Sequence, residues 1–204
     1  MEKKYELTDE TIEFRGKTLH RIRALKNFGD VKKGNLGGFI QNESNLSHDG
    51  NCWVGDDAKI YGYAKVLGDA HVYGNACADG FARVYDKAKV FGNAYIDNIA
   101  DIYENACIFG SACITGQTNI FGNAQIFGHA HVFASAQIYE NAQVSGGAFI
   151  SGKAKIYGNA KIYDIPLISI RAKVGGNAKI CGEAFIQGNA EIINDEIIST
   201  GERQ

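Results

Sequence analysis

The sequence predicts an all-β fold: a single-stranded, left-handed parallel β-helix of about eight to nine triangular coils with an N-terminal β-hairpin cap. Two observations lead to this prediction. Between Ala58 and Ala190 an alanine occupies every sixth position in 21 of 23 cases, the exceptions being Thr118 and Pro166. Isoleucine or valine follows two residues after each of these positions, except at Ala78. A repeat this short indicates a solenoid in which each unit packs only on its neighbours.

The six-residue unit predicts one short strand and one corner. Tyr157-Gly158-Asn159-Ala160-Lys161-Ile162 is a typical unit. Alternate side chains of a strand share one face, so the alanine and the aliphatic residue point inward and the residue between them points outward. Glycine and asparagine tolerate a positive φ and mark the corner. Three units close a triangle of about 18 residues, which alanine and isoleucine can fill, whereas a right-handed quadrilateral helix would repeat in fives.

The segments outside the repeat predict caps. The inward register extends back to Leu46 and Ile40, so we place the β-helix at residues 36–192. Upstream, apolar and polar residues alternate around Arg15-Gly16, which predicts a β-hairpin cap within residues 1–35. Residues 193–204 are expected to form a C-terminal cap or tail. Caps are needed because an open coil end exposes apolar interior and unpaired strand edges.

Pro166 stands in one of the alanine positions, within a coil whose corner lacks the usual Gly-Asn pair. Proline has no backbone N–H and is normally confined to edges or bulges of sheets. We therefore expect one ladder hydrogen bond to be lost there and the coil to bulge or bend.

Composition and charge exclude several classes of function. The 21 Lys and Arg against 23 Asp and Glu give a net charge of −2, which argues against a nucleic-acid-binding surface. The five cysteines show no CxxC or Cys/His spacing, so we expect neither a disulfide framework nor a metal site, and we expect a reducing cytoplasm. No stretch approaches the roughly 20 apolar residues that span a bilayer. We expect a cytoplasmic protein without membrane or nucleic-acid partners.

Outward positions 18 residues apart fall into columns, and one column is mostly apolar. Its uncharged part is the candidate surface for a homo-oligomer, a trimer being favoured over a dimer, because soluble monomers seldom expose extended apolar patches. The alternative is that these side chains merely lie on the sheet or under the N-terminal cap. The candidate interface residues are Tyr95, Cys113, His131, Phe149, Leu167 and Phe185.

Corner positions form columns of like residues. Rings at a strand spacing of about 4.8 Å can stack with an offset, and side-chain amides can form a hydrogen-bonded ladder. We assign both kinds of ladder to stability, the alternative being a platform on which a base or sugar stacks. One aromatic column is Tyr85, Tyr103, Phe121, Tyr139 and Tyr157, a second is Tyr73, Phe91, Phe109 and Phe127, and the amide column is Asn105, Asn123, Asn141, Asn159 and Asn177.

The small and aliphatic residues at fixed offsets resemble the hexapeptide-repeat superfamily, which includes trimeric acyltransferases with left-handed β-helices. The segments Phe28-Gly29-Asp30-Val31, Leu36-Gly37-Gly38-Phe39-Ile40 and Gly50-Asn51-Cys52-Trp53-Val54 are similar to the opening motif of YdcK-like proteins of bacteria and phages. The resemblance implies acyl transfer from coenzyme A by a catalytic histidine near a protomer interface. His131, in the apolar column, is the residue to which that role falls. The six-residue phase is unbroken from Cys52 to Ile192, so the loop that shapes the donor pocket in those enzymes has no counterpart.

We therefore expect a noncatalytic, oligomeric β-helix that acts as a structural or protein-binding module without a cofactor. The phage resemblance adds the expectation of a host-protein partner that the module would inhibit. One alternative is a coenzyme-A-dependent acyltransferase with His131 as the general base. Another is capture of a nucleotide-like ligand between protomers. His129 and His131 provide two ligands only, which do not make a metal site.

Overall fold

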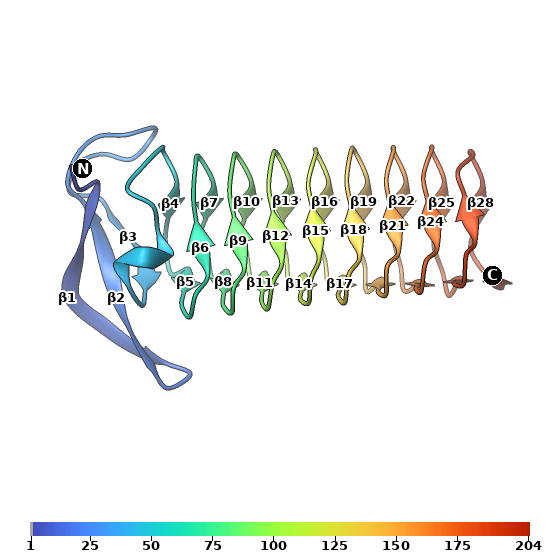
Figure 1. Cartoon of the computed structure of the whole chain (residues 1–204), viewed down its shortest axis with the longest axis horizontal. Coiled ribbons are helices and arrows are strands. Elements are labelled where there is room, and N and C mark those ends of the chain that lie inside the picture. The colour runs from blue at the N-terminus through green and yellow to red at the C-terminus, as the bar shows by residue number, and fades with distance from the viewer. Residues whose placement is uncertain (1) are drawn as a thin grey trace.

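The computed structural model describes residues 2–204, and most of them form a left-handed β-helix of about nine turns. Figure 1 shows the coils standing side by side along one axis, with a β-hairpin across one end. No α-helix occurs within residues 2–204, and the one helical turn is the 3-10 segment η1 (Glu43–Asn45). The predicted fold class and the N-terminal hairpin are therefore confirmed.

Three sheets form the sides of the prism. The first sheet consists of β1 (Tyr5–Phe14), β2 (Lys17–Ala24), β3 (Leu36–Ile40), β5 (Lys59–Ile60), β8 (Cys77–Ala78), β11 (Tyr95–Ile96), β14 (Cys113–Ile114), β17 (His131–Val132), β20 (Phe149–Ile150), β23 (Leu167–Ile168), β26 (Phe185–Ile186) and β29 (Glu202–Arg203). The second sheet consists of β4 (Trp53–Val54), β7 (His71–Val72), β10 (Lys89–Val90), β13 (Cys107–Ile108), β16 (Gln125–Ile126), β19 (Gln143–Val144), β22 (Lys161–Ile162), β25 (Lys179–Ile180) and β28 (Ile197–Ile198). The third sheet consists of β6 (Lys65–Val66), β9 (Arg83–Val84), β12 (Asp101–Ile102), β15 (Asn119–Ile120), β18 (Gln137–Ile138), β21 (Lys155–Ile156), β24 (Lys173–Val174) and β27 (Glu191–Ile192).

The register within each sheet is the predicted one. From β4 to β28 parallel strands pair residues that lie 18 apart, as Tyr95 pairs with Cys113 and Ile96 with Ile114. At the two ends of the first sheet the spacing changes, because Phe39 of β3 pairs with Lys59 and Phe185 of β26 pairs with Glu202. The inward alanines and aliphatic residues from Ala58 to Ile186 are at most 1% exposed, so they form one continuous core along the axis. Thr118 occupies an alanine position in this core and leaves its Oγ1 without a hydrogen-bond partner.

The corners depend on residues in the left-handed conformation. Most are glycines, and a Cβ at Gly128 would lie 3.0 Å from the backbone nitrogen of Gly146 in the next coil. Five corners carry Asp or Glu with positive φ, and each carboxylate accepts an N–H from the next coil at 2.7–3.2 Å. The donors and acceptors are Gly74 to Asp56, Glu104 to Asp86, Gly122 to Glu104, Gly158 to Glu140 and Gly182 to Asp164.

The expectation of a distorted coil at Pro166 is wrong. The ladder passes through this coil intact: Ile165 donates to Gly182 at 3.1 Å and Leu167 donates to Ala184 at 2.9 Å, while the Pro166 carbonyl accepts from Phe149 at 2.9 Å. The register of the flanking strands is unchanged. The reason is that the N–H of an alanine position faces its own corner rather than the next coil, so proline there removes no ladder donor.

The N-terminal end of the prism is closed from several directions. Tyr5 and Ile22 of the hairpin are fully buried against the first coils, and the Tyr5 hydroxyl donates to the Leu46 carbonyl at 2.8 Å. Lys4 is 1% exposed, and its ammonium donates to the Cys52 carbonyl at 2.9 Å. The buried Lys4 ammonium is therefore paired with backbone carbonyls at the coil end, which offsets the cost of removing its charge from water.

Residues 193–204 continue the coil. Strand β28 extends the second sheet beside β25, and β29 extends the first sheet beside β26. Glu196 stands in the inward position that alanine occupies elsewhere, and Arg203 pairs with the core residue Ile186. The Arg203 and Glu196 side chains approach to 3.9 Å. The last coil therefore carries opposite charges where the other coils carry core residues.

Candidate functional site

The apolar face is the outer surface of the first sheet from β14 to β26. Its central row contains no Lys, Arg, Asp or Glu. The residues two positions before and two positions after each member of the row, from Cys113 to Leu167, also include no Lys, Arg, Asp or Glu. Phe149 is 42% exposed and Leu167 38%, although both are large and apolar. The row consists of Cys113, His131, Phe149, Leu167 and Phe185, with Phe133 and Ile165 exposed beside it. The residues of the predicted apolar column from Cys113 to Phe185 therefore lie in register on one sheet, and their role as an oligomer interface stays a prediction.

His131 lies flat against Phe149 on this face, with ring centroids 4.9 Å apart and planes 4° apart. Within residues 2–204 no carboxylate forms a hydrogen bond or an ion pair with its imidazole, and no group of three or more potential metal ligands occurs. Burial raises the pKa of the neighbouring Cys113 thiol, with Asp97 acting in the same direction, so the thiol is not activated as a nucleophile. The catalytic role of His131 stays a prediction.

Tyr95, at the start of the predicted interface, contacts the chain's own hairpin. Arg15, at the hairpin tip, donates to the Tyr95 hydroxyl at 2.9 Å and to that of Tyr61 at 3.2 Å. The guanidinium also lies 4.9 Å from the Tyr95 ring centroid. Phe14 packs edge-on against Tyr61, which is fully buried. The hairpin therefore covers the first sheet as far as β11, and the free apolar face begins at Cys113.

The two predicted aromatic columns form continuous stacks. Consecutive rings lie 4.8–5.4 Å apart, with planes within 8° of parallel. A third, shorter stack pairs Tyr63 with Phe81 at 4.9 Å. The predicted amide ladder is also present, because Asn105, Asn123, Asn141, Asn159 and Asn177 are joined by hydrogen bonds of 3.0–3.3 Å. These arrangements stiffen the corners along the axis.

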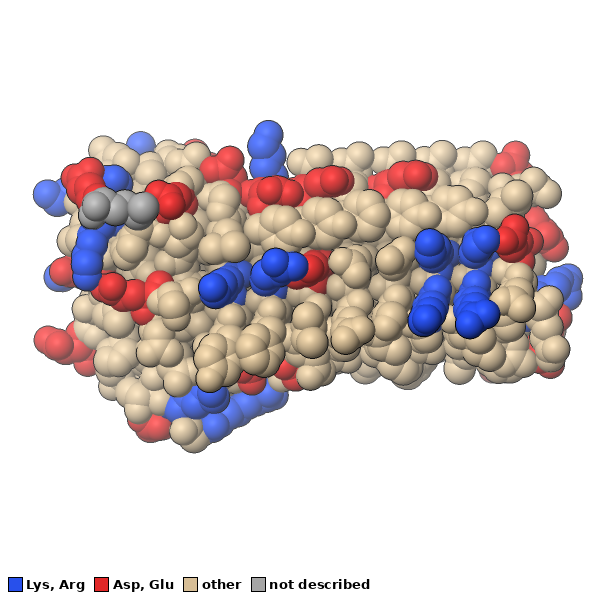
Figure 2. All heavy atoms as spheres, in the orientation of Figure 1, with Lys and Arg blue, Asp and Glu red and all other residues tan. Residues whose placement is uncertain are grey.

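Charge is distributed unevenly along the axis. Residues 95–150 contain no Lys or Arg, whereas residues 151–182 contain six of them against the single acidic residue Asp164. Figure 2 shows basic side chains gathered near the C-terminal end of the third sheet, where Lys155 and Lys173 are paired neighbours with Lys153 and Arg171 beside them. The third sheet is therefore polar, in contrast to the apolar face.

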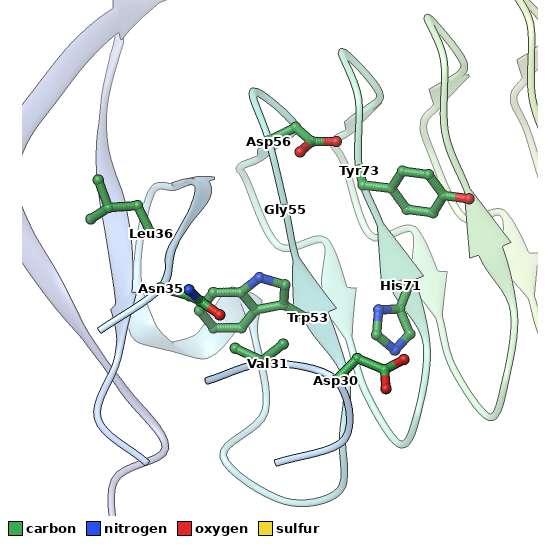
Figure 3. A pocket seen from close by; sticks show the side chains of 9 residues that line it. All are labelled: Asp30, Val31, Asn35, Leu36, Trp53, Gly55, Asp56, His71 and Tyr73. Carbon is green, nitrogen blue, oxygen red and sulfur yellow. The ribbon is translucent and has the colours of Figure 1, made fainter. Parts of the chain in front are cut away.

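A pocket of about 370 Å³ lies where the loop before β3 crosses the first coils of the second sheet. Figure 3 shows Trp53 and Asp56 on one coil, His71 and Tyr73 on the next, and Asp30 reaching toward His71 from the loop. Burial lowers the pKa of His71, and the adjacent Lys89 acts in the same direction, so its imidazole is neutral near pH 7. The full lining is Asp30, Val31, Asn35, Leu36, Trp53, Gly55, Asp56, His71 and Tyr73.

Sequence reasoning did not identify this pocket. Two features of the sequence point to the pocket: the single tryptophan of the chain, Trp53, and Gly55, which stands where the aromatic column of Tyr73 would otherwise continue. The pocket depends on where the loop crosses the coils, and the repeat pattern does not specify that path.

The comparisons with known proteins agree with the fold and leave the chemistry open. No known family model matches the chain. The chain is similar to "Uncharacterized acetyltransferase YdcK" of Escherichia coli (strain K12), with 32% identity over 83 residues. That match covers 36% of this chain and 26% of the relative, so the chain spans about a quarter of the length of the protein it matches. The similarity and the coil architecture together fit a YdcK-like hexapeptide-repeat protein. Within residues 2–204 no helix is long and apolar enough to cross a membrane.

Proposed function

We propose that this protein is a noncatalytic, self-associating β-helical module whose apolar face, from Cys113 to Phe185, is its contact surface. The observation that supports this proposal is the uncharged row of exposed aromatic and aliphatic side chains on a flat sheet. Burying apolar surface contributes roughly 25 cal/mol per Å², and the rigid ladder beneath it loses little conformational freedom on association.

A trimer is the arrangement that we favour. In a trimer the prisms stand side by side and each apolar face packs into the seam between two neighbours, so all three faces are covered by closed symmetry. A dimer would cover the same rows in an isologous contact. In both arrangements the polar third sheet, with Lys155 and Lys173, stays in solvent.

We also propose a setting for this function. All five cysteines are free, which suits a reducing cytoplasm. The resemblance to phage proteins supports a host protein as a further partner, which the assembled module would bind and inhibit. The polar faces left free in the oligomer would then provide that second contact.

The test is the mass of the protein in solution, measured by light scattering after gel filtration and by native mass spectrometry. We expect a trimer for the wild type, and monomers for Phe149→Lys and Leu167→Lys, because an unpaired ammonium would be buried at the contact. Gln143→Lys and Gln137→Lys place the same charge on the other two sheets and should leave the mass unchanged. A monomeric wild type, or a Phe149→Lys variant that still associates, would overturn the proposal.

Acyl transfer is a second candidate, supported by the similarity to a protein that carries the name acetyltransferase. His131, at a protomer seam, would act as the general base that takes the proton of an acceptor hydroxyl. That oxygen would attack the thioester carbonyl of acetyl-coenzyme A, and coenzyme A would leave as the thiol. Native mass spectrometry with acetyl-coenzyme A tests it directly. Binding of the donor, followed by turnover that His131→Ala abolishes, would support the enzyme, whereas absence of donor binding would support the noncatalytic module.

A further inference from the structure

One aromatic stack stops at Tyr73 with a ring face uncovered. The Tyr73 ring lies 4.9 Å from the Phe91 ring on the side of the next coil, with planes 5° apart. On the side of the preceding coil, the residue in the same column is Gly55, as the pairing of Val54 with Val72 shows. The stack therefore lacks one ring at this end, and the pocket described above contains the space that this ring would occupy.

A comparison of two glycines shows that this space is open. Each ring of the stacks leans over the next coil, so a Cβ at Gly175 would lie 2.4 Å from Cε2 of Tyr157. At Gly55 the nearest atom to an added Cβ is the Tyr73 Cβ at 3.4 Å, and the next is on Trp53 at 3.7 Å. No ring of the column covers Gly55, because the residue 18 positions earlier is Gly37, and only the edge of the Trp53 indole lies beside it.

The rim of the gap provides hydrogen-bonding groups of both kinds. Trp53 is 7% exposed, and its indole N–H donates to no residue of the described chain. The fully enclosed side-chain atoms without a partner in that part of the chain belong to His48 and Thr118, so the indole nitrogen reaches the pocket surface. Asp56 uses Oδ2 to accept from Gly74 at 2.9 Å, which leaves its other oxygen free. The Asp30 carboxylate lies on the opposite side, beside His71 (Figure 3).

We propose that this pocket binds a nucleobase, which stacks on Tyr73 as the missing ring of the column. A base presents a flat face of the required kind to the exposed tyrosine ring. Its amino and ring N–H groups donate to the free carboxylate oxygens, and a ring nitrogen or carbonyl accepts from the Trp53 indole. Guanine fits best, because its two adjacent N–H donors match the two oxygens of the Asp30 carboxylate, while Asp56 keeps only one oxygen free.

The same groups disfavour other ligands. An anion would face Asp30 and Asp56, with no Lys or Arg in the lining. A simple ammonium would leave the Trp53 N–H without an acceptor, and an unpaired buried donor costs free energy. The site lies within one chain, on the second sheet, so it does not require the oligomer of the proposed function.

The experiment is a titration of the full-length protein with guanosine, adenosine, cytidine and uridine, by calorimetry and by the fluorescence of Trp53, the single tryptophan. We expect guanosine to bind most tightly and to change the Trp53 emission. Gly55→Phe should weaken guanosine binding at least tenfold while preserving the fold, because its ring would complete the stack. Position 55 tolerates a side chain, since Gly55 has no positive φ and an added Cβ makes only ordinary contacts.

Ser145→Phe is the matched control. It adds a ring at the other end of the same column, after Phe127, and should leave guanosine binding unchanged. Asp56→Asn and Asp30→Asn test the contribution of each carboxylate to binding. At least one of these substitutions should weaken guanosine binding more than uridine binding. Absence of nucleoside binding, unchanged binding by Gly55→Phe, or binding of a neutral monosaccharide in place of the nucleosides would each overturn the proposal.

Discussion

Arg15, at the tip of the hairpin, donates a hydrogen bond of 2.9 Å to the hydroxyl of Tyr95, 80 residues further along the chain. Arg15 has a φ of 49°, which the two-residue turn with Gly16 requires. The same guanidinium also bonds to Tyr61, so one side chain attaches the hairpin tip to two coils of the first sheet.

Arg15→Ala should therefore loosen the hairpin without disturbing the coils. We expect amide hydrogen exchange to accelerate in β1 and β2 and to stay unchanged beyond β11, with a loss of about 1 kcal/mol in local stability. Arg23→Ala is the control, because Arg23 pairs with Glu6 of the hairpin itself. Equal exchange in the two variants would contradict the role of Arg15.

Pro166→Ala should change stability by no more than about 0.5 kcal/mol, because the nitrogen at this position lies outside the ladder. Leu167→Pro, one residue later, should cost about 3 kcal/mol or more, because Leu167 donates to Ala184 at 2.9 Å. Thermal unfolding followed by circular dichroism compares the two variants. A large gain for Pro166→Ala would contradict this assignment, because it would show that an N–H restored at this position contributes to the ladder.

Glu140→Ala should destabilise the protein by about 1–2 kcal/mol. The Glu140 carboxylate accepts from the Gly158 N–H at 2.7 Å, and alanine would leave that donor unpaired while keeping a positive φ of 58°. Glu140→Gly also removes the acceptor but adopts this φ without strain, so it should cost less. Urea unfolding of both variants measures the difference, and a glycine variant less stable than the alanine variant would exclude this explanation.

Stability should fall as the pH drops below about 6.5. Burial lowers the pKa of His48, which stacks on Tyr5 at 4.4 Å, and burial also lowers the pKa of His71. Between these lowered values and the value near 6.5 of an exposed histidine, the unfolded chain binds more protons, so stability increases with pH. We expect a lower Tm at pH 5.5 than at pH 7.5, and a smaller difference in His48→Gln. A Tm that is constant across this range would contradict the assignment.

The periodic part of the molecule could be predicted residue by residue. Whether Ile96 or Ala100 points inward depends only on its place in the six-residue unit, and both are fully buried. The stacks and the amide ladder follow for the same reason, since identical residues recur at one strand spacing. The expectation at Pro166 was wrong because the N–H of an alanine position donates to its own corner, as Ala58 donates to Gly55, and not to the next coil.

The parts that break the repeat could not be predicted. Tyr61 occupies a corner that is partly exposed elsewhere, and its full burial depends on how Phe14 and Leu19 of the hairpin fold back over it. The pocket beside Gly55 depends in the same way on the path of the loop that carries Asp30. Such contacts join segments outside the repeat to the coils, so the repeat does not predict them.

In a three-sided coil, the number of six-residue units between two residues determines which side of the prism each of them faces. Removing three six-residue units between Cys113 and Phe149 would shorten the prism by one coil, about 4.8 Å, and leave Phe149 on the same side as Cys113. Removing one unit would rotate every later residue by a third of a turn and divide the apolar face between two sides. Insertions and deletions in such a protein are therefore tolerated in steps of whole coils. The number of residues in the coils determines on which side of the prism a partner can bind at each end.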